Sequence, residues 1–418
     1  MSNTSTDTIP TDAREVIAYL RSPQAIRDRS EQLFALALAH RLKYFRCDLT
    51  QLDSVADYVI DVIRDQYPDL NIPFHSRWRH FEVGESARLQ NLERAFQGLS
   101  ALERARAKFD LVVPSVLLDA GAGAQWRYRE PQTHQIWQRS EGLAVASFDC
   151  FCQGMFSSDS EHPYQSDAEG LQRVTSERLG AGFQVSDENP LVGLEGRSRL
   201  LQTLGQSLYH SPDLFGIDHP RIGRLVDYLL AHAKDGKLSV TIVFQSVLEG
   251  LAPIWPSRLA ISGVNLGDVW HHSALVGPPF ADLIPFHKLS QWLTYSLLEP
   301  LEELGLTLTD LDQMTGLPEY RNGGLCLDLG LLHLKDSEMR QYRHFPGDEI
   351  IVEWRSLTIS LLDRIADTIR RRLDLTSADL PLVKILQGGT WTAGRKIASQ
   401  LRPDGAPPLQ IDSDGTVF

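Results

Sequence analysis

Several segments of this sequence mix aromatic, basic and acidic side chains densely enough to suggest a ligand site. In the first, residues 73–81 (PFHSRWRHF), two histidines and two arginines are interleaved with aromatic rings. Guanidinium groups bind anions and stack on planar groups, so this segment could bind an anionic, planar molecule. A solvated, arginine-rich helix start accounts for the same spacing equally well. The binding candidates in this segment are His75, Arg77, Trp78 and Arg79.

Metal binding is the weaker interpretation of the same segment. His75 and His80 are five positions apart, so their side chains diverge on a helix, and no third ligand is evident nearby. Cys150 and Cys152 would also lie on diverging helix faces without a neighbouring base, which is typical of buried packing. We therefore expect no metal and no other cofactor.

A second segment, residues 118–123 (LDAGAG), follows a long apolar stretch. Its glycines could expose backbone N–H groups to a phosphate. The segment is neither a Walker loop nor a GxGxxG sequence after a strand, so a cap at a helix C-terminus is the favoured interpretation.

The densest region, residues 255–324, holds two acids of interest. Asp268 precedes Trp270 in an apolar context, where the pKa of a carboxyl group can be tuned for proton transfer; a helix N-cap or a turn acid is an equal alternative. Glu319 follows a Gly-Leu-Pro turn between two apolar helical segments, so it would begin a helix and face a cleft. Capping alone explains Glu319 about as often as catalysis does.

Between these two acids lies a stripe of functional groups. His287, Gln291 and Tyr295 follow one another at intervals of four residues, which places them on one face of a helix beside Lys288. Core packing does not need four such groups, so the stripe favours a ligand-binding face.

Helices must position these side chains, because apolar residues recur three and four positions apart along most of the chain. Strand signals are few and no alternation of strands and helices appears, which predicts a mainly α fold in a single large domain. We predict a tail at residues 1–10, a helical body at residues 11–387 and a Gly/Pro-rich segment at residues 388–418. That last segment would dock on the body through Thr416, Val417 and Phe418.

Composition argues against several classes of partner. The chain has 54 acidic residues against 41 Lys and Arg, a net charge of −13, whereas a nucleic-acid binder needs a basic face. Four cysteines in 418 residues are no disulfide framework, and the polar N-terminus lacks a secretory pattern. No apolar stretch is long enough to span a bilayer. We therefore expect a cytoplasmic protein with no nucleic-acid or membrane partner.

Taken in order, seven motifs resemble the uracil catabolism protein 4 family, whose members take part in a non-reductive route of pyrimidine breakdown. The resemblance covers nearly the whole chain and implies a role in uracil catabolism. The motifs are HSRWRHF (75–81), LLDAGAG (117–123), NPLVGLEGR (189–197), GDVW (267–270), PFHKLSQWLTY (285–295), LPEYRNGG (317–324) and SDGTVF (413–418).

Two of these motifs are also similar to the queuosine 5′-phosphate N-glycosidase family, helical enzymes of the helix–hairpin–helix DNA-glycosylase type. Its Ala-Asp-Leu-Trp motif is similar to residues 267–270, and its Ala-Asp-Tyr-Arg motif is similar to residues 318–321. The resemblance implies that Asp268 and Glu319 form the acid pair that cleaves the bond between ribose and base. Glu319 replaces an aspartate and so lengthens that side chain by one methylene.

The two resemblances together predict an N-glycosidase that acts on a ribosylated uracil-breakdown product, such as ribosylurea or its 5′-phosphate. A carboxylate would stabilise the oxocarbenium-like sugar, and a donor would protonate the leaving nitrogen. The expected partner is therefore a small ribosyl or ribosyl-phosphate molecule. The predicted catalytic residues are Asp268 and Glu319, and the predicted binding residues are His75, Arg77, Trp78, Arg79, Trp270, His287, Lys288, Gln291, Tyr320, Arg321 and Asn322.

Two alternatives remain open at this point. A non-catalytic protein that binds uracil or a nucleotide and regulates or assists a pathway enzyme would explain the aromatic and cationic clusters without acid chemistry. A metal-dependent amidohydrolase would use the histidines at positions 75, 80, 271, 272 and 287, although their spacing supports it poorly.

Overall fold

The computed structural model describes residues 11–119, 121–123, 125–255, 258–402 and 404–412. The predicted tail at residues 1–10 lies outside the described residues. So do the docking residues Thr416, Val417 and Phe418, together with the rest of the motif at residues 413–418.

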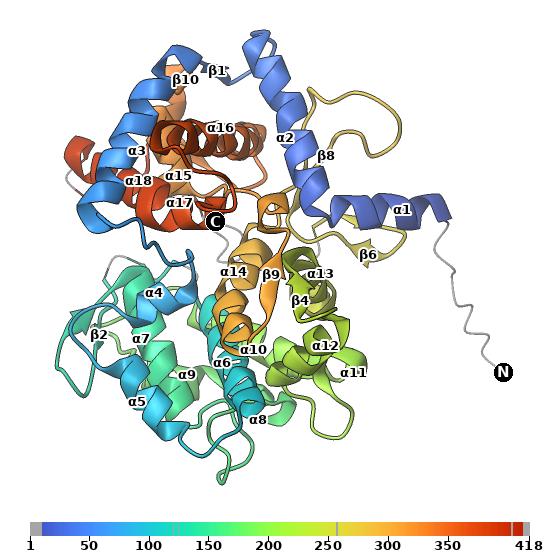
Figure 1. Cartoon of the computed structure of the whole chain (residues 1–418), viewed down its shortest axis with the longest axis vertical. Helices are drawn as coiled ribbons and strands as arrows, with labels where there is room; N and C mark the ends of the chain where they lie inside the picture. The colour runs from blue at the N-terminus through green and yellow to red at the C-terminus, as the bar shows by residue number, and fades with distance from the viewer. Residues whose placement is uncertain (1–10, 120, 124, 256–257, 403, 413–418) are drawn as a thin grey trace.

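Helices dominate the described residues, as Figure 1 shows. The α-helices are α1 (Thr11–Leu20), α2 (Pro23–Leu38), α3 (Leu52–Gln66), α4 (Arg77–Phe81), α5 (Arg88–Ala95), α6 (Ala101–Leu117), α7 (Arg139–Cys152), α8 (Ala168–Gln172), α9 (Ser176–Gly182), α10 (Leu194–Leu208), α11 (Pro212–Phe215), α12 (Leu225–His232), α13 (Val240–Gly250), α14 (Lys288–Glu303), α15 (Tyr320–Asp328), α16 (Glu349–Leu373), α17 (Leu382–Ile385) and α18 (Trp391–Leu401).

The strands are short, and every sheet among the described residues has two of them. The antiparallel pairs are β1 (Phe45–Cys47) with β10 (Leu332–Leu334), β2 (Tyr128–Arg129) with β3 (Ile136–Trp137), β5 (Ala260–Ile261) with β6 (Val264–Asn265), and β7 (Val269–His271) with β8 (Leu283–Pro285). The parallel pairs are β4 (Lys237–Ser239) with β9 (Thr307–Thr309), and β11 (Arg343–His344) with β12 (Gln410–Ile411). The predicted mainly α fold in a single domain is confirmed, whereas the likeness to helix–hairpin–helix DNA glycosylases stays a prediction.

Two groups of helices meet at α14. In Figure 1, α2, α3, α15, α16 and α18 form the upper group, α4 to α12 form most of the lower group, and α14 lies between the two. Helix α16 is buried on nearly all sides over its first half, where polar side chains such as Glu353 and Arg355 are buried among apolar ones. Helix α14 packs against α6 and α13.

Apolar residues recur at helical spacing over residues 171–179, but this segment belongs to two short helices, α8 and α9, and not to one continuous helix. The chain breaks at Thr175, whose extended backbone and side-chain oxygen cap α9 by accepting a hydrogen bond from the N–H of Arg178. A threonine offers the backbone this local alternative to a continuous helix, which apolar spacing alone does not reveal.

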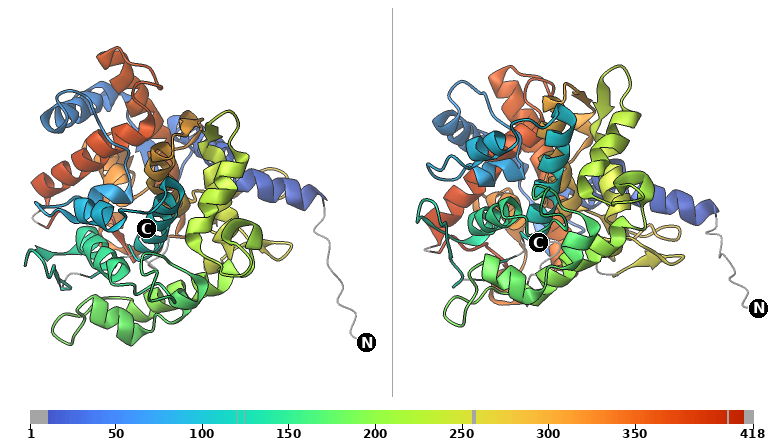
Figure 2. Two further views of the ribbon diagram at one scale, coloured as in Figure 1. Left: turned by 60° about the horizontal axis from the view of Figure 1, so that its bottom comes forward. Right: turned by 90° about the horizontal axis from the view of Figure 1, so that it is seen from below.

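One large apolar core joins most elements and includes Leu409 near the end of the described residues. A smaller cluster packs α1, through Ala13, Ile17 and Leu20, on Val269 and Leu283 of the β7–β8 hairpin. Helix α1 accordingly lies at the edge of the molecule in all views of Figures 1 and 2. Among the described helices, none combines the length and the apolar composition needed to cross a bilayer.

Candidate functional site

Side chains from several of the predicted motifs line one cavity of about 270 Å³, which we call the Glu319 cavity. The elements around it belong to both helix groups of Figure 1: the start of α4, the loop after α6, the start of α7, the first turns of α14 and α15, and the start of α18. The predicted residues that line it are His75, Lys288, Glu319, Tyr320 and Arg321. The other lining residues are His80, Asp119, Gly121, Ala122, Gly123, Arg139, Ser140, Trp292, Leu317 and Trp391.

Glu319 is the N-cap of α15 and a wall of this cavity at once. Its backbone is extended (φ −115°, ψ 168°), and its carboxylate accepts the N–H groups of Arg321 at 2.8 Å and Asn322 at 2.7 Å. A carboxylate offers about four acceptor positions, so two are left for a ligand or a proton. Burial raises the pKa of Glu319, although these N–H groups and the nearby cations Arg321 and Lys288 oppose the rise.

Lys288 occupies the first turn of α14 and lines the same cavity. Within the part of the chain that the structure describes, its ammonium group makes no hydrogen bond and no ion pair. Burial lowers the pKa of Lys288, Arg355 lowers it further, and the carboxylates of Glu319 and Asp119 oppose this. The cavity therefore contains a lysine that is desolvated and held by no carboxylate among the described residues.

Asp119 supplies a second carboxylate to the cavity. It follows α6, and Nη1 of the fully buried Arg77 lies 3.1 Å from its Oδ1. Arg77 is itself fixed by donating from Nε to the hydroxyl of Ser115 at 2.8 Å. Burial raises the pKa of Asp119, and Arg77 opposes the rise. Arg77 therefore orients an acid of the cavity without lining the cavity itself.

Aromatic and imidazole rings form another wall. The ring of His75 lies 5.7 Å from that of Trp391, and its Nδ1 lies 2.9 Å from Oε1 of Gln387. The ring of His80 meets Trp292 and Trp391 edge to face. Burial lowers the pKa of His75 to about 4 and holds that of His80 well below its ordinary value, so both rings are neutral near pH 7.

Arg321 lies over the face of Trp391, with 4.4 Å from Cζ to the ring centroid. Among the described residues it forms no ion pair with a carboxylate. A guanidinium that is stacked in this way, and that no described carboxylate pairs with, is held in place where it can bind an anion.

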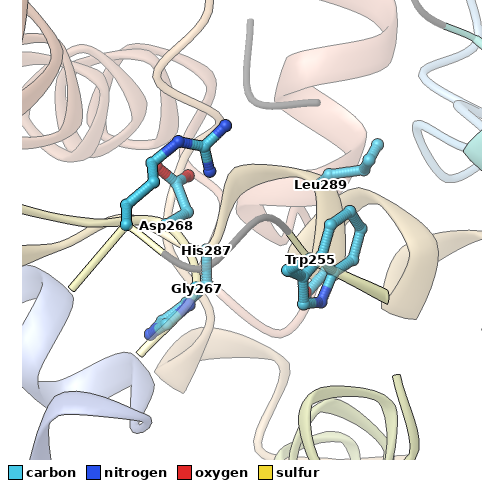
Figure 3. A pocket seen from close by; sticks show the side chains of 7 residues that line it. Trp255, Gly267, Asp268, His287 and Leu289 are labelled. Carbon is cyan, nitrogen blue, oxygen red and sulfur yellow. The ribbon is translucent and has the colours of Figure 1, made fainter. Parts of the chain in front are cut away.

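Asp268 lies outside the Glu319 cavity, in a much smaller cavity of about 20 Å³. Figure 3 shows Asp268 on one side of this small cavity and Trp255 and Leu289 on the other. His287 also lines it, and its Nε2 lies 2.9 Å from the carbonyl oxygen of Leu20.

All of the acceptor positions of Asp268 are in use. Arg355 donates to both of its oxygens, at 2.9 and 2.7 Å, Nε1 of Trp270 donates to Oδ1 at 2.7 Å, and the N–H of Lys288 donates to Oδ2 at 3.1 Å. Burial alone would raise the pKa of Asp268, but Arg355 and these hydrogen bonds hold it well below its usual range. Asp268 therefore anchors the start of α14, and through it Lys288.

The remaining predicted binding residues face the protein interior or another partner. Trp78 donates from Nε1 to the carbonyl of Ser296, and Arg79 pairs with Glu299. Gln291 is fully buried and binds the backbone of Phe286 and Thr315, and the Asn322 amide donates to the carbonyl of Leu317. The side chains of Trp78, Arg79, Trp270, His287, Gln291 and Asn322 do not line the Glu319 cavity.

No group of three or more His, Cys, Asp or Glu side chains among the described residues could hold a metal ion. His271 pairs with Asp282, and His272 lies near Glu353, away from His75 and His80. The histidines considered for an amidohydrolase site are thus not gathered at one point.

A family model described as "Protein of unknown function (DUF1688)" matches residues 19–418. The chain belongs to this family. It is 42% identical over 414 residues to "Protein urg3" of Schizosaccharomyces pombe, with 97% of this chain and 99% of that protein covered. It is 39% identical over 437 residues to "Uracil catabolism protein 4" of Lachancea kluyveri, with 96% and 99% covered. The resemblance to the uracil catabolism protein 4 family is therefore confirmed.

In this DUF1688 member, sequence reasoning did not assign Asp119, Ser140, Trp292 or Trp391 to the site. The sequence favours a helix cap for the loop after Asp119, but a carboxylate followed by two glycines is also the one sequence feature that points to a site there. Trp391 follows a π-helical turn at Leu386–Thr390 and belongs to a segment described by its glycine and proline content. Only packing against α15 brings that residue to the cavity.

Proposed function

We propose that this chain acts in uracil catabolism as a hydrolase of the N-glycosidase type. The substrate would be a ribosylated breakdown product such as ribosylurea or its 5′-phosphate, and the leaving group urea or a related amide. The name of the Lachancea kluyveri relative supports the pathway. The Glu319 cavity supports the reaction type.

One observation carries the proposed reaction: two buried carboxyl groups, Glu319 and Asp119, line a single cavity, and both have raised pKa values. Cleavage of an N-glycosidic bond needs a proton for the leaving nitrogen and negative charge beside the oxocarbenium-like sugar. A carboxyl group with a raised pKa can keep the proton that it must donate. A buried carboxylate stabilises the cation more strongly than one in water does.

We assign the proton donor to Glu319 and the stabilising carboxylate to Asp119. Glu319 has two free acceptor positions, whereas Arg77 holds Asp119 in place. Tyr320 and Trp391 offer flat surfaces to the ribose and the urea group, and Arg321 is a partner for a 5′-phosphate. Asp268 keeps a positioning role at the start of α14, because its oxygens are already fully bonded.

The cavity volume fits this class of substrate. Ligand pockets typically measure roughly 300–1,000 Å³, so about 270 Å³ suits a molecule the size of a ribosyl phosphate. A nucleic-acid duplex would not fit, and we propose neither a nucleic acid nor a membrane as partner.

The test is to incubate the purified chain with ribosylurea and with its 5′-phosphate and to measure urea and the free sugar. We expect stoichiometric release of both, unchanged by EDTA. Tight binding of either compound in calorimetry without any product would overturn the hydrolase and favour the non-catalytic binding protein. Activity that EDTA abolishes would favour the amidohydrolase.

A further inference from the structure

Lys288 is in a position that ordinary helix chemistry does not favour. It is the first residue of α14, where the helix dipole repels a cation, and the residue before it, His287, adopts a left-handed conformation (φ 47°, ψ 37°). A non-glycine residue is strained in this region of backbone conformation. The turn sends the side chain of His287 to the small cavity and that of Lys288 to the Glu319 cavity.

The surroundings keep this lysine available. Asp268 is close by and could have been its counter-ion, but both of its oxygens are bonded to Arg355. Asp268 binds the backbone N–H of Lys288 instead, at 3.1 Å, and so fixes the root of the side chain while leaving its tip unpaired among the described residues.

These features have a chemical consequence. Arg355 and the start of α14 both oppose the ammonium form, and burial lowers the pKa of Lys288. Glu319, Asp119 and Asp268 act in the opposite direction, but none of them forms an ion pair with it. A desolvated lysine beside another cation is a common way to obtain a neutral, nucleophilic amine.

We propose that Lys288 is the covalent nucleophile of this site and forms an imine with C1 of the ribosyl group. The inference rests on the proposed N-glycosidase function and deepens it, because it implies a substrate whose sugar can open to an aldehyde-level carbon. A substrate with a blocked ring would not be turned over.

The steps balance without a redox partner. The Lys288 amine attacks C1, the bond from C1 to the urea nitrogen breaks, and Glu319 gives that nitrogen its proton and then takes one from the new C1–N link. The bond from C1 to the ring oxygen then breaks as the nitrogen lone pair forms the protonated imine, and Glu319 returns the proton to the ring oxygen. Water adds to C1 and gives one proton to the Glu319 carboxylate. The remaining hydroxyl proton passes to the nitrogen as the C1–N bond breaks, so the neutral Lys288 amine leaves, and the net reaction is ribosylurea plus water to ribose plus urea.

Trapping with sodium cyanoborohydride tests the imine. The full chain is incubated with ribosylurea 5′-phosphate, or with ribose 5-phosphate, in the presence of the reductant and is then analysed by intact-protein and peptide mass spectrometry. We expect one reduced ribityl phosphate group on Lys288. Lys288→Arg, which keeps the charge but cannot form an imine, should lose the adduct and reduce urea release to the level of the protein-free reaction.

A matched control uses Lys108, a buried lysine at the opposite end of α14 from Lys288. Lys108 is ion-paired with Glu93 and Glu303, so Lys108→Arg should leave both the adduct and the turnover as in the wild type. Circular dichroism and thermal unfolding check that each variant is folded.

The outcomes separate the two proposals. Urea release by the wild type without any adduct, or by folded Lys288→Arg at the wild-type rate, overturns the imine and leaves the hydrolase standing. An adduct on Lys288 with ribose 5-phosphate but no urea release overturns the N-glycosidase and supports imine formation. Neither an adduct nor urea release overturns both.

Discussion

Asp268 and Glu319 are both buried acids near a helix start, but they differ in their hydrogen-bond partners and in the cavity beside them. Each carboxylate is buried, and each accepts a hydrogen bond from a backbone N–H at the start of a helix. Around Asp268, however, Arg355 and Trp270 fill the remaining positions, and the cavity beside it is too small for any ligand but water. Around Glu319, positions stay open and the cavity is more than ten times larger.

The contrast distinguishes an acid that stabilises this protein from one that is available for chemistry. Asp268, whose acceptor positions are all hydrogen-bonded and whose pKa is lowered, contributes to stability. Glu319, which has open acceptor positions and a raised pKa, is available for proton transfer. Mutations and pH should therefore act on different observables in the two regions.

The largest expected effect is on turnover in the Glu319 cavity. Glu319→Gln keeps one oxygen to cap α15 but cannot donate the proton, so kcat should fall about 10²–10⁴-fold. Stability should fall by only about 0.5–2 kcal/mol, as for a lost cap. Urea release and urea-induced unfolding measure the two quantities. An unchanged kcat in the folded variant would remove Glu319 from the mechanism.

The next effect belongs to Asp268 and to stability. Asp268→Asn removes the negative charge from the buried pair with Arg355, which should lower the free energy of unfolding by about 3–5 kcal/mol. The control is Asp363→Asn, which breaks the more exposed pair with Arg27 and should cost about 1 kcal/mol or less. Equal losses of unfolding free energy in the two variants would show that the Asp268–Arg355 pair stabilises the fold no more than the exposed pair does.

His75 should make the cavity wall sensitive to acid. Burial lowers the pKa of His75 to about 4, so between about pH 4 and 6.5 His75 binds a proton in the unfolded chain but not in the folded chain. The contribution of neutral His75 to the free energy of unfolding is present above the ordinary histidine pKa of about 6.5. It is lost as the pH falls to about 4. The loss should approach about 3 kcal/mol. His75→Phe should flatten this part of the unfolding curve, and an unflattened curve would place the acid sensitivity elsewhere.

The smallest expected effect is a pair of opposite pH trends. Glu319 has a raised pKa in the folded chain, so its stabilisation is present below about pH 4.3 and is lost as the pH rises through the folded value. Asp268 has a lowered pKa, so its stabilisation is present above about pH 3.9 and is lost as the pH falls.

The measurement follows from these signs. The difference in unfolding free energy between the wild type and Glu319→Gln should shrink as the pH rises above about 4.3, and that for Asp268→Asn should shrink as the pH falls below about 3.9. Parallel trends would mean that the two acids share one environment.

The sequence predicts much of this fold because its apolar spacing is local information. The buried faces of α6, α14 and α16 follow from it, and the turn before Glu319 predicts a helix start that faces a cleft. The spacing does not reveal which residues from elsewhere in the chain pack beside each helix end. Asp119 and Trp391 are far apart in sequence, and only tertiary packing brings them to one cavity.

Asp268 is a second example of a residue whose partner cannot be predicted from the local sequence. Its motif predicts a tuned acid, and the structure tunes its pKa downward, because Arg355 comes from the distant helix α16. No feature within residues 267–270 reveals that partner. Gln291 and Tyr295 similarly lie on the predicted helix, but they bind backbone groups near Thr315 instead of facing the cavity.

The contribution of α18 to the cavity has a consequence during synthesis. The chain emerges from the ribosome with its N-terminus first, so His75, Asp119, Lys288 and Glu319 are all made before Trp391. Until α18 packs on α15, Arg321 lacks the ring beneath it and one side of the cavity stays open to water. A nascent chain with every acid and amine in place is thus still unable to enclose a substrate. The arrival of one late helix completes the wall of the Glu319 cavity.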